Sequence, residues 1–143
     1  MTIPTSTVRQ NYWAILVAAI ACFLFEAAWY TIFMMPWLAG IGRTAQWLES
    51  AAGYNPALQY ATAFFGSAVI AAAIARATQL TGPQTALRGV KVAALLWLGL
   101  VLPVFAIEEV FEVRPLSLLG INAGFWLLGM MLMGAIVGAW KKK

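Results

Sequence analysis

The stretch NYWAILVAAIACFLFEAAWYTIF, residues Asn11–Phe33, decides the fold. It contains one charged side chain, Glu26, and about 20 apolar residues are what a helix needs to cross the hydrocarbon core of a bilayer. A carboxylate inside such a segment is costly unless it faces protein, water or a partner. We therefore predict that this segment is a membrane-spanning helix that turns Glu26 away from lipid.

The composition of the whole chain agrees with this prediction. Of its 143 residues, 63% are hydrophobic and 10% are charged, whereas about a quarter of the residues in a soluble domain are charged. The length suits one small integral membrane domain. The net charge of +4 comes from basic residues scattered around the hydrophobic segments. We therefore expect the lipid bilayer, and no nucleic acid, among its partners.

The single cysteine, Cys22, and the lack of histidine exclude several kinds of site. One cysteine forms no intramolecular disulfide and no cysteine-based metal site. Without histidine, the commonest general base and the usual haem ligand are missing, and no Ser–His or Cys–His nucleophile can be assembled. We expect no catalytic residue, no metal site and no resident cofactor. For Trp97 and Trp126 we favour packing in the core, and surface contact with a lipid, quinone or pigment is the alternative.

Four apolar segments predict an all-α membrane bundle of four helices with short loops. The expected spans cover residues 11–34, 57–77, 86–111 and 116–140, and residues 44–52 suit a short helix in the membrane interface. We expect the first span to stop near Pro36, because proline cannot continue a helix without losing a hydrogen bond. Asn55 and Pro56 suit the N-cap and first position of the second span. Pro103 should kink the third span.

The distribution of lysine and arginine predicts the orientation. With four spans, the two termini and the middle connection share one side, which carries seven basic residues: Arg9, Arg76, Arg88, Lys91, Lys141, Lys142 and Lys143. The other two connections carry only Arg43 and Arg114. Because cytoplasmic loops are enriched in lysine and arginine, we expect both termini in the cytoplasm.

Short motifs along nearly the whole chain point to one family. They are Trp29-Tyr30 followed by Phe33, Trp37 and Gly40; Leu102-Pro103-Val104 followed by Phe111-Glu112 and Arg114-Pro115; and Ile121-Asn122-Ala123-Gly124. In this order and spacing they resemble the DUF1761 family of small, mostly bacterial, four-helix membrane proteins of unknown function. The resemblance implies the same architecture in a bacterial inner (plasma) membrane. It implies no particular chemistry.

Glu26, Tyr30 and Asn122 form the candidate polar site inside the membrane. Glu26 and Tyr30 share a helix face because they are four residues apart. Glu26 could bind a proton or a cation. The alternative, which we favour, is that Glu26 pairs with Arg114 or with the hydroxyl of Tyr30 and only fixes packing. For Asn122 we favour hydrogen bonding between helices over contact with a ligand.

A second candidate is the outer-side cluster of Glu108, Glu109, Glu112 and Arg114 at the end of the third span. Glu108 and Glu112 share a helix face, whereas adjacent Glu108 and Glu109 point about 100° apart and form no carboxylate pair. The cluster could line a mouth that binds cations. We favour a solvated helix end with one ion pair to Arg114.

Glycines in the last span form two G-x-x-x-G pairs, Gly120 with Gly124 and Gly134 with Gly138. Such pairs let another helix approach closely. The sequence leaves open whether that helix belongs to this chain or to a partner.

These features favour a membrane protein that is not an enzyme. The leading interpretation is an accessory or structural subunit that packs against other membrane helices of a larger complex, because the chain is small, has short loops and lacks a catalytic set. The alternative is a small homo-oligomeric transporter or channel for protons or cations that uses Glu26. Co-purifying proteins would indicate the first, and flux that depends on Glu26 would indicate the second.

Overall fold

The computed structural model describes residues 9–141, and this part of the chain contains helices and turns and no strand. The elements are α1 (Tyr12–Ile32), α2 (Met34–Gly40), α3 (Ala45–Ser50), α4 (Pro56–Leu80), α5 (Ala86–Leu96), the π-helical turn η1 (Trp97–Val101), α6 (Leu102–Phe111) and α7 (Leu116–Ala139). Within the described part, α1, α4, the continuous α5–η1–α6 unit and α7 are long and apolar enough to cross a membrane. The predicted all-α fold with four spans is confirmed, and the chain is a multi-pass membrane protein.

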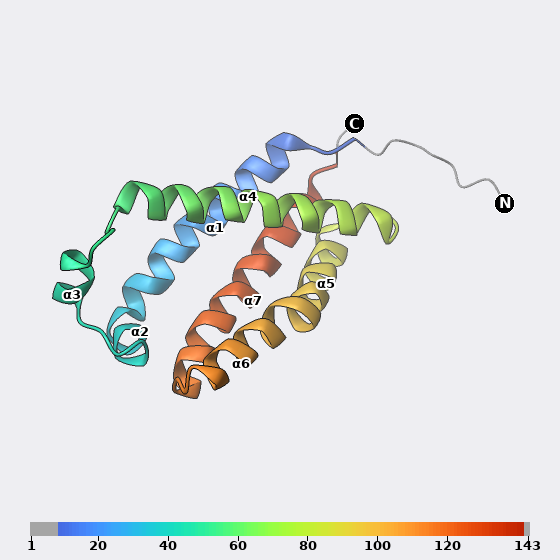
Figure 1. Ribbon diagram of the computed structural model, residues 1–143. Coiled ribbons are helices and arrows are strands. Elements are labelled where there is room, and N and C mark those ends of the chain that lie inside the picture. Colours follow the sequence, from blue (N-terminus) through green and yellow to red (C-terminus); the bar gives the residue numbers. More distant parts are fainter. Residues whose placement is uncertain (1–8, 142–143) are drawn as a thin grey trace.

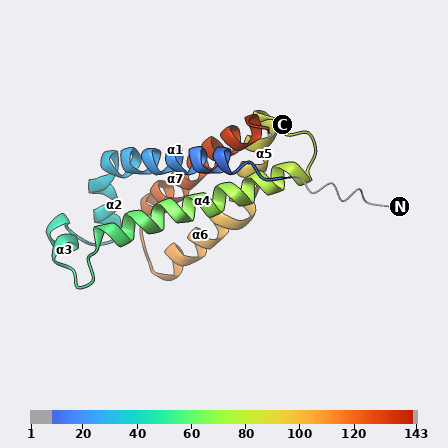
Figure 2. The ribbon, with the colours of Figure 1, turned by 90° about the horizontal axis from the view of Figure 1, so that it is seen from above.

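Helix α7 lies at the centre of the bundle. It packs against α5, α1 and α4, and α4 crosses both α1 and α7 (Figure 1). Helices α1 and α7 run side by side (Figure 2). They are antiparallel, because Asn11 is hydrogen-bonded to Trp140 at one end and Trp29 to Ile121 nearer the other. We call the end that holds Asn11 and Trp140 the terminus end, and the opposite end the α2–α3 end.

The helix starts follow the expected capping chemistry. The side-chain oxygen of Asn55 accepts a hydrogen bond from the backbone N–H of Leu58, and Pro56 occupies the first position of α4, as predicted. Helix α4 continues to Leu80, three residues past the expected end of the second span at residue 77. The short helix expected within residues 44–52 is present as α3.

The first span differs from the prediction at Pro36. Helix α1 already ends at Ile32, and Pro36 lies in the first turn of α2, a short helix that the sequence did not predict. The N–H groups of a first turn have no partner within the helix, so a proline there removes no hydrogen bond. Pro36 therefore helps to begin a helix instead of ending one.

The third span is continuous but irregular just before Pro103. Residues Trp97–Val101 form a π-helical turn, and the N–H of Leu102 donates to the carbonyl of Trp97. Pro103 has no N–H, and its ring would crowd the carbonyl four residues earlier, at Gly99. Widening this turn relieves the crowding, which explains how the expected irregularity at Pro103 takes this form.

The core lies where α4 and α5 meet α1 and α7, and most of its members are small or flexible. Its buried residues include Ala14, Ala18, Cys22, Ala71, Ile74, Ala75, Ala93, Phe125, Met130, Met133 and Val137. Small side chains at helix crossings let backbones approach, which is the main source of packing energy between helices in lipid.

The glycines of α7 fall into two groups. A Cβ on Gly134 would overlap the backbone of Gly89, and a Cβ on Gly138 would overlap the backbone of Thr85. This pair therefore packs within the chain, against α5. A Cβ on Gly120 would meet nothing within 4 Å, and one on Gly124 would lie 3.6 Å from the ring of Trp29. Only Gly120 of the four leaves open space beside it.

Candidate functional site

Asn122 connects three helices near the α2–α3 end. The hydroxyl of Tyr30 on α1 donates to Asn122 Oδ1 over 3.1 Å, and Asn122 Nδ2 donates to Glu109 Oε1 on α6 over 3.0 Å. The Glu109 residue is only 4% exposed. The hydrogen bonding between helices that we favoured for Asn122 is present, and one of its partners is a buried carboxylate.

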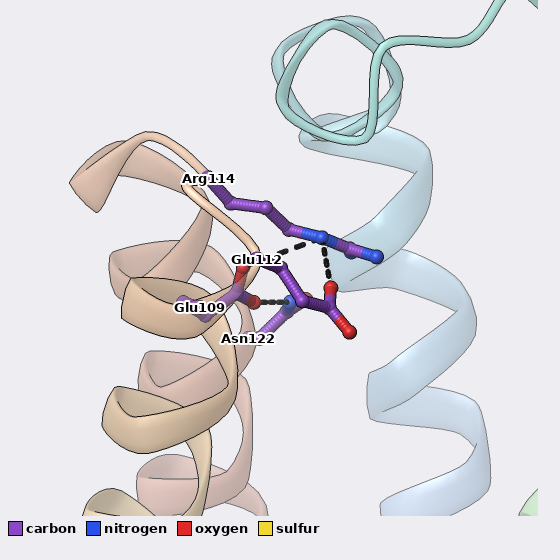
Figure 3. A network of polar contacts seen from close by, with 4 residues as sticks. All are labelled: Glu109, Glu112, Arg114 and Asn122. Carbon is purple, nitrogen blue, oxygen red and sulfur yellow. Dashed lines mark hydrogen bonds and ion pairs between the residues drawn. The ribbon is translucent and has the colours of Figure 1, made fainter.

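Arg114 extends this network towards the end of the bundle. Its Nε lies 3.9 Å from Glu109 Oε2 and forms a second ion pair with Glu112 (Figure 3). The Glu112 side chain is 52% exposed and that of Arg114 is 37% exposed. We call these five residues, from Tyr30 through Asn122 and Glu109 to Arg114 and Glu112, the polar bridge.

The outer-side cluster is therefore not the solvated helix end with one ion pair that we favoured. Glu108 is exposed and makes none of these contacts, whereas Glu109 is buried and Arg114 pairs with two carboxylates. The 100° offset between Glu108 and Glu109 explains the difference, because it turns one of them inward and the other outward.

The connection between Glu109 and Asn122 was missed, although the sequence holds a signal for it. Helices α6 and α7 are joined by a tight turn at Arg114-Pro115. Glu109 lies six residues before Pro115, and Asn122 lies seven residues after it. Residues at similar distances from a tight turn between antiparallel helices lie at a similar height, so the two side chains can meet. The bond from Tyr30 spans 92 positions and has no such local signal.

Two tryptophans hold the same part of α7. Trp29 Nε1 on α1 donates to the carbonyl of Ile121 over 3.2 Å, and Trp97 Nε1 in η1 donates to the carbonyl of Ala123 over 2.8 Å. The two accepting carbonyls belong to the residues directly before and after Asn122 in the sequence. Trp97 therefore packs within the chain, as we favoured, and the hydrogen bond to Ala123 is an addition that the sequence did not predict.

Glu26 is not part of the polar bridge. Its Oε2 is buried and has no hydrogen-bond partner, and no ion pair in residues 9–141 includes it. The pairing with Arg114 or Tyr30 that we favoured is wrong, because Arg114 contacts Glu109 and Glu112 and the hydroxyl of Tyr30 donates to Asn122. Tyr30 is thus hydrogen-bonded to Asn122 and not to Glu26, although Glu26 and Tyr30 line the same hollows.

Three hollows between α1 and its neighbours meet at Glu26. The smallest, about 210 Å³, is lined by Phe23, Glu26, Ala27, Tyr30, Gln59, Tyr60 and Ala63. A second, of about 410 Å³, extends towards Trp37 and Leu48 near the α2–α3 end. A third, of about 620 Å³, extends along α4 to Ile70 and to Trp126 of α7. We call these three hollows together the Glu26 groove.

The polar bridge and the Glu26 groove are suited to different roles. In the polar bridge most polar atoms have partners within the chain, so the bridge is suited to fixing α1, α6 and α7 relative to one another. The Glu26 groove holds a carboxylate oxygen without a partner beside open volume, so it is suited to binding. The described residues contain no group of three or more His, Cys, Asp or Glu side chains that could hold a metal ion.

Comparisons with known proteins identify the family and nothing closer. Residues 13–138 match the family described as "Protein of unknown function (DUF1761)", and this range includes Glu26 and the whole polar bridge. No curated protein and no solved structure matches the chain. With nearly its full length matched, and with the motifs that resembled this family in place on α1, α6 and α7, the chain belongs to the DUF1761 family.

Proposed function

We propose that this protein is a non-catalytic accessory or structural subunit that packs against other membrane helices of a larger complex. Its membrane would be the bacterial inner membrane, with both termini in the cytoplasm. The observation that supports this proposal most is the outward face of the third span. In the most apolar 18-residue stretch of the third span, 6% of the residues are buried within the chain. In the corresponding stretch of α7, 39% are buried.

Gly99 gives that face a specific shape. A Cβ on Gly99 would meet nothing within 4 Å, and the neighbouring Leu98 and Leu100 are 57% and 63% exposed. A glycine on an exposed membrane helix allows another helix to approach closely. Here the glycine lies in a π-helical turn, and such turns are frequent at functional positions. The exposed face of the third span therefore has a notch at Gly99, between Leu98 and Leu100. A side chain of a partner helix fits into this notch.

The test is co-purification from native membranes with a matched pair of variants. Gly99→Leu fills the proposed notch, and Gly120→Leu adds the same side chain at another open position, on α7. We expect the wild type and Gly120→Leu to retain a membrane protein at a constant ratio in mild detergent and Gly99→Leu to lose it. If cross-linking in native membranes yields only monomers of the wild type, the proposal fails.

The Glu26 groove favours a second candidate function, a homo-oligomeric transporter or channel that carries protons or cations. Intramembrane carboxylates without structural partners commonly mark ion pathways. Flux in liposomes should then be lost in Glu26→Gln and kept in Glu49→Gln, which changes an exposed residue of α3. Wild-type protein that supports no proton or cation flux would eliminate this candidate.

A further inference from the structure

We infer that the Glu26 groove is a binding site for an organic ammonium ion that carries an apolar body. The inference concerns binding alone, so it holds whether or not the chain transports its ligand or docks on a partner. It starts from the unpartnered Oε2 of Glu26. A buried carboxylate oxygen without a hydrogen bond is costly in a membrane, and a cation in the adjoining space removes that cost.

The walls of the groove narrow the choice of cation. Beside Glu26, the smallest hollow is lined by the rings of Phe23, Tyr30 and Tyr60. The rings of Phe23 and Tyr60 meet edge to face at 6.1 Å, which joins α1 to α4 there. Aromatic faces attract ammonium groups through their quadrupoles, and they suit the apolar substituents of such ions as well.

The groove does not suit a divalent metal ion. Divalent ions need several oxygen or nitrogen ligands around them, and Glu26 is the only acidic residue that lines any of the three hollows. An anion would be repelled by Glu26, and no Lys or Arg lines these hollows to bind it. One carboxylate among aromatic and aliphatic walls matches one positive charge on an apolar molecule.

The size of the groove also fits this class. The three hollows have volumes of about 210, 410 and 620 Å³, within or near the range of small-molecule sites. They meet at Glu26, so an ammonium group placed there can extend its apolar part along α4 towards Trp126 or towards Trp37. A free amphiphilic amine and the ethanolamine headgroup of a lipid share this chemistry.

Binding is tested with labelled benzyltrimethylammonium and purified protein in a maltoside detergent, which contains no ammonium group. Equilibrium dialysis should show saturable binding to the wild type. The neutral carbon isostere, neopentylbenzene, should not displace the label. We expect Glu26→Gln to weaken binding tenfold or more, because it removes the charge and keeps the shape, and Tyr60→Leu to weaken it severalfold.

A control outside the groove and a second groove variant make the result decisive. Glu108→Gln changes an exposed carboxylate outside the groove and should bind like the wild type. Tyr60 is 63% exposed, so Tyr60→Leu reports on the groove even if Glu26→Gln fails to fold.

Displacement by phosphatidylethanolamine but not by phosphatidylglycerol would identify a lipid headgroup as the occupant, and no displacement by either would identify a free amine. Absence of saturable binding, or equal binding by the wild type and both groove variants, would overturn the inference.

Discussion

Asn122→Leu gives the most direct test of the polar bridge. The substitution removes the acceptor of Tyr30 and the donor to Glu109 at once. A hydrogen bond between membrane helices contributes about 0.6 kcal/mol on average, so the two bonds account for roughly 1 kcal/mol. The larger effect comes from Glu109, which is 4% exposed and would keep only Arg114 at 3.9 Å. Because removing a partner from a buried charge costs several kcal/mol, we expect a total loss of about 2–4 kcal/mol.

The assay is reversible unfolding in mixed detergent micelles, followed by circular dichroism. Tyr30→Phe removes only the hydroxyl and should cost about 0.6 kcal/mol. The double variant Glu109→Leu/Asn122→Leu should be more stable than Asn122→Leu alone, because it leaves no buried carboxylate behind. This order among three variants follows from which polar atoms lose their partners.

Two results would refute the reasoning. If Asn122→Leu costs no more than Tyr30→Phe, then Glu109 does not depend on Asn122. If adding Glu109→Leu to Asn122→Leu costs as much stability as Glu109→Leu costs alone, then the two residues act independently and the bridge is not a unit.

Three further predictions follow from the backbone and the surface. Gly134→Ala should destabilise the protein by about 1–3 kcal/mol because its Cβ overlaps the backbone of α5, whereas Gly120→Ala should change the melting temperature little or raise it, since Gly120 is open. Val113→Gly should raise the melting temperature, because Val113 has a φ of 55°, a left-handed conformation that costs a non-glycine residue about 1–2 kcal/mol. A thiol reagent that does not cross membranes should label Glu49→Cys on intact cells and Lys141→Cys only after permeabilisation, with Cys22 silent because it is buried; the reverse pattern would contradict the expected orientation.

The four spans could be predicted from the sequence because lipid imposes a simple rule on them. A helix in a bilayer needs a long apolar run, and turn residues such as Asn55-Pro56 and Arg114-Pro115 separate these runs plainly. Pro103 likewise predicted an irregular third span. The carbonyl that loses its N–H donor at a proline has no water to bond with in the hydrocarbon core. A widened turn relieves the crowding at Pro103, but other kinks would do so too, so the sequence did not predict that this irregularity would be a π-helical turn.

The candidate sites were harder to predict, because they depend on how the helices are rotated about their axes. Helical spacing shows that Glu108 and Glu109 point in different directions, but it does not show which of them faces α7. Since all faces of these helices are rich in apolar residues, hydrophobic patterning gives little guidance on rotation. The sequence therefore identified these polar residues and the hydrogen-bonding role of Asn122, but it assigned Glu26 a partner within the chain that it does not have.

The contrast between Glu109 and Glu26 supports the inference that the Glu26 groove is a binding site. Both carboxylates lie in membrane-spanning segments of the same small bundle. Glu109 receives a hydrogen bond from Asn122 and an ion pair from Arg114, so this fold can provide partners for an intramembrane charge. Tyr30 is near both, and its hydroxyl donates to the Glu109 network and leaves Glu26 without it. Glu109 Oε2 also lacks a hydrogen bond, but it lies 3.9 Å from Arg114. Glu26 is half-buried, has no ion pair in the described residues and lies beside open volume, which supports the inference that its partner comes from outside the chain.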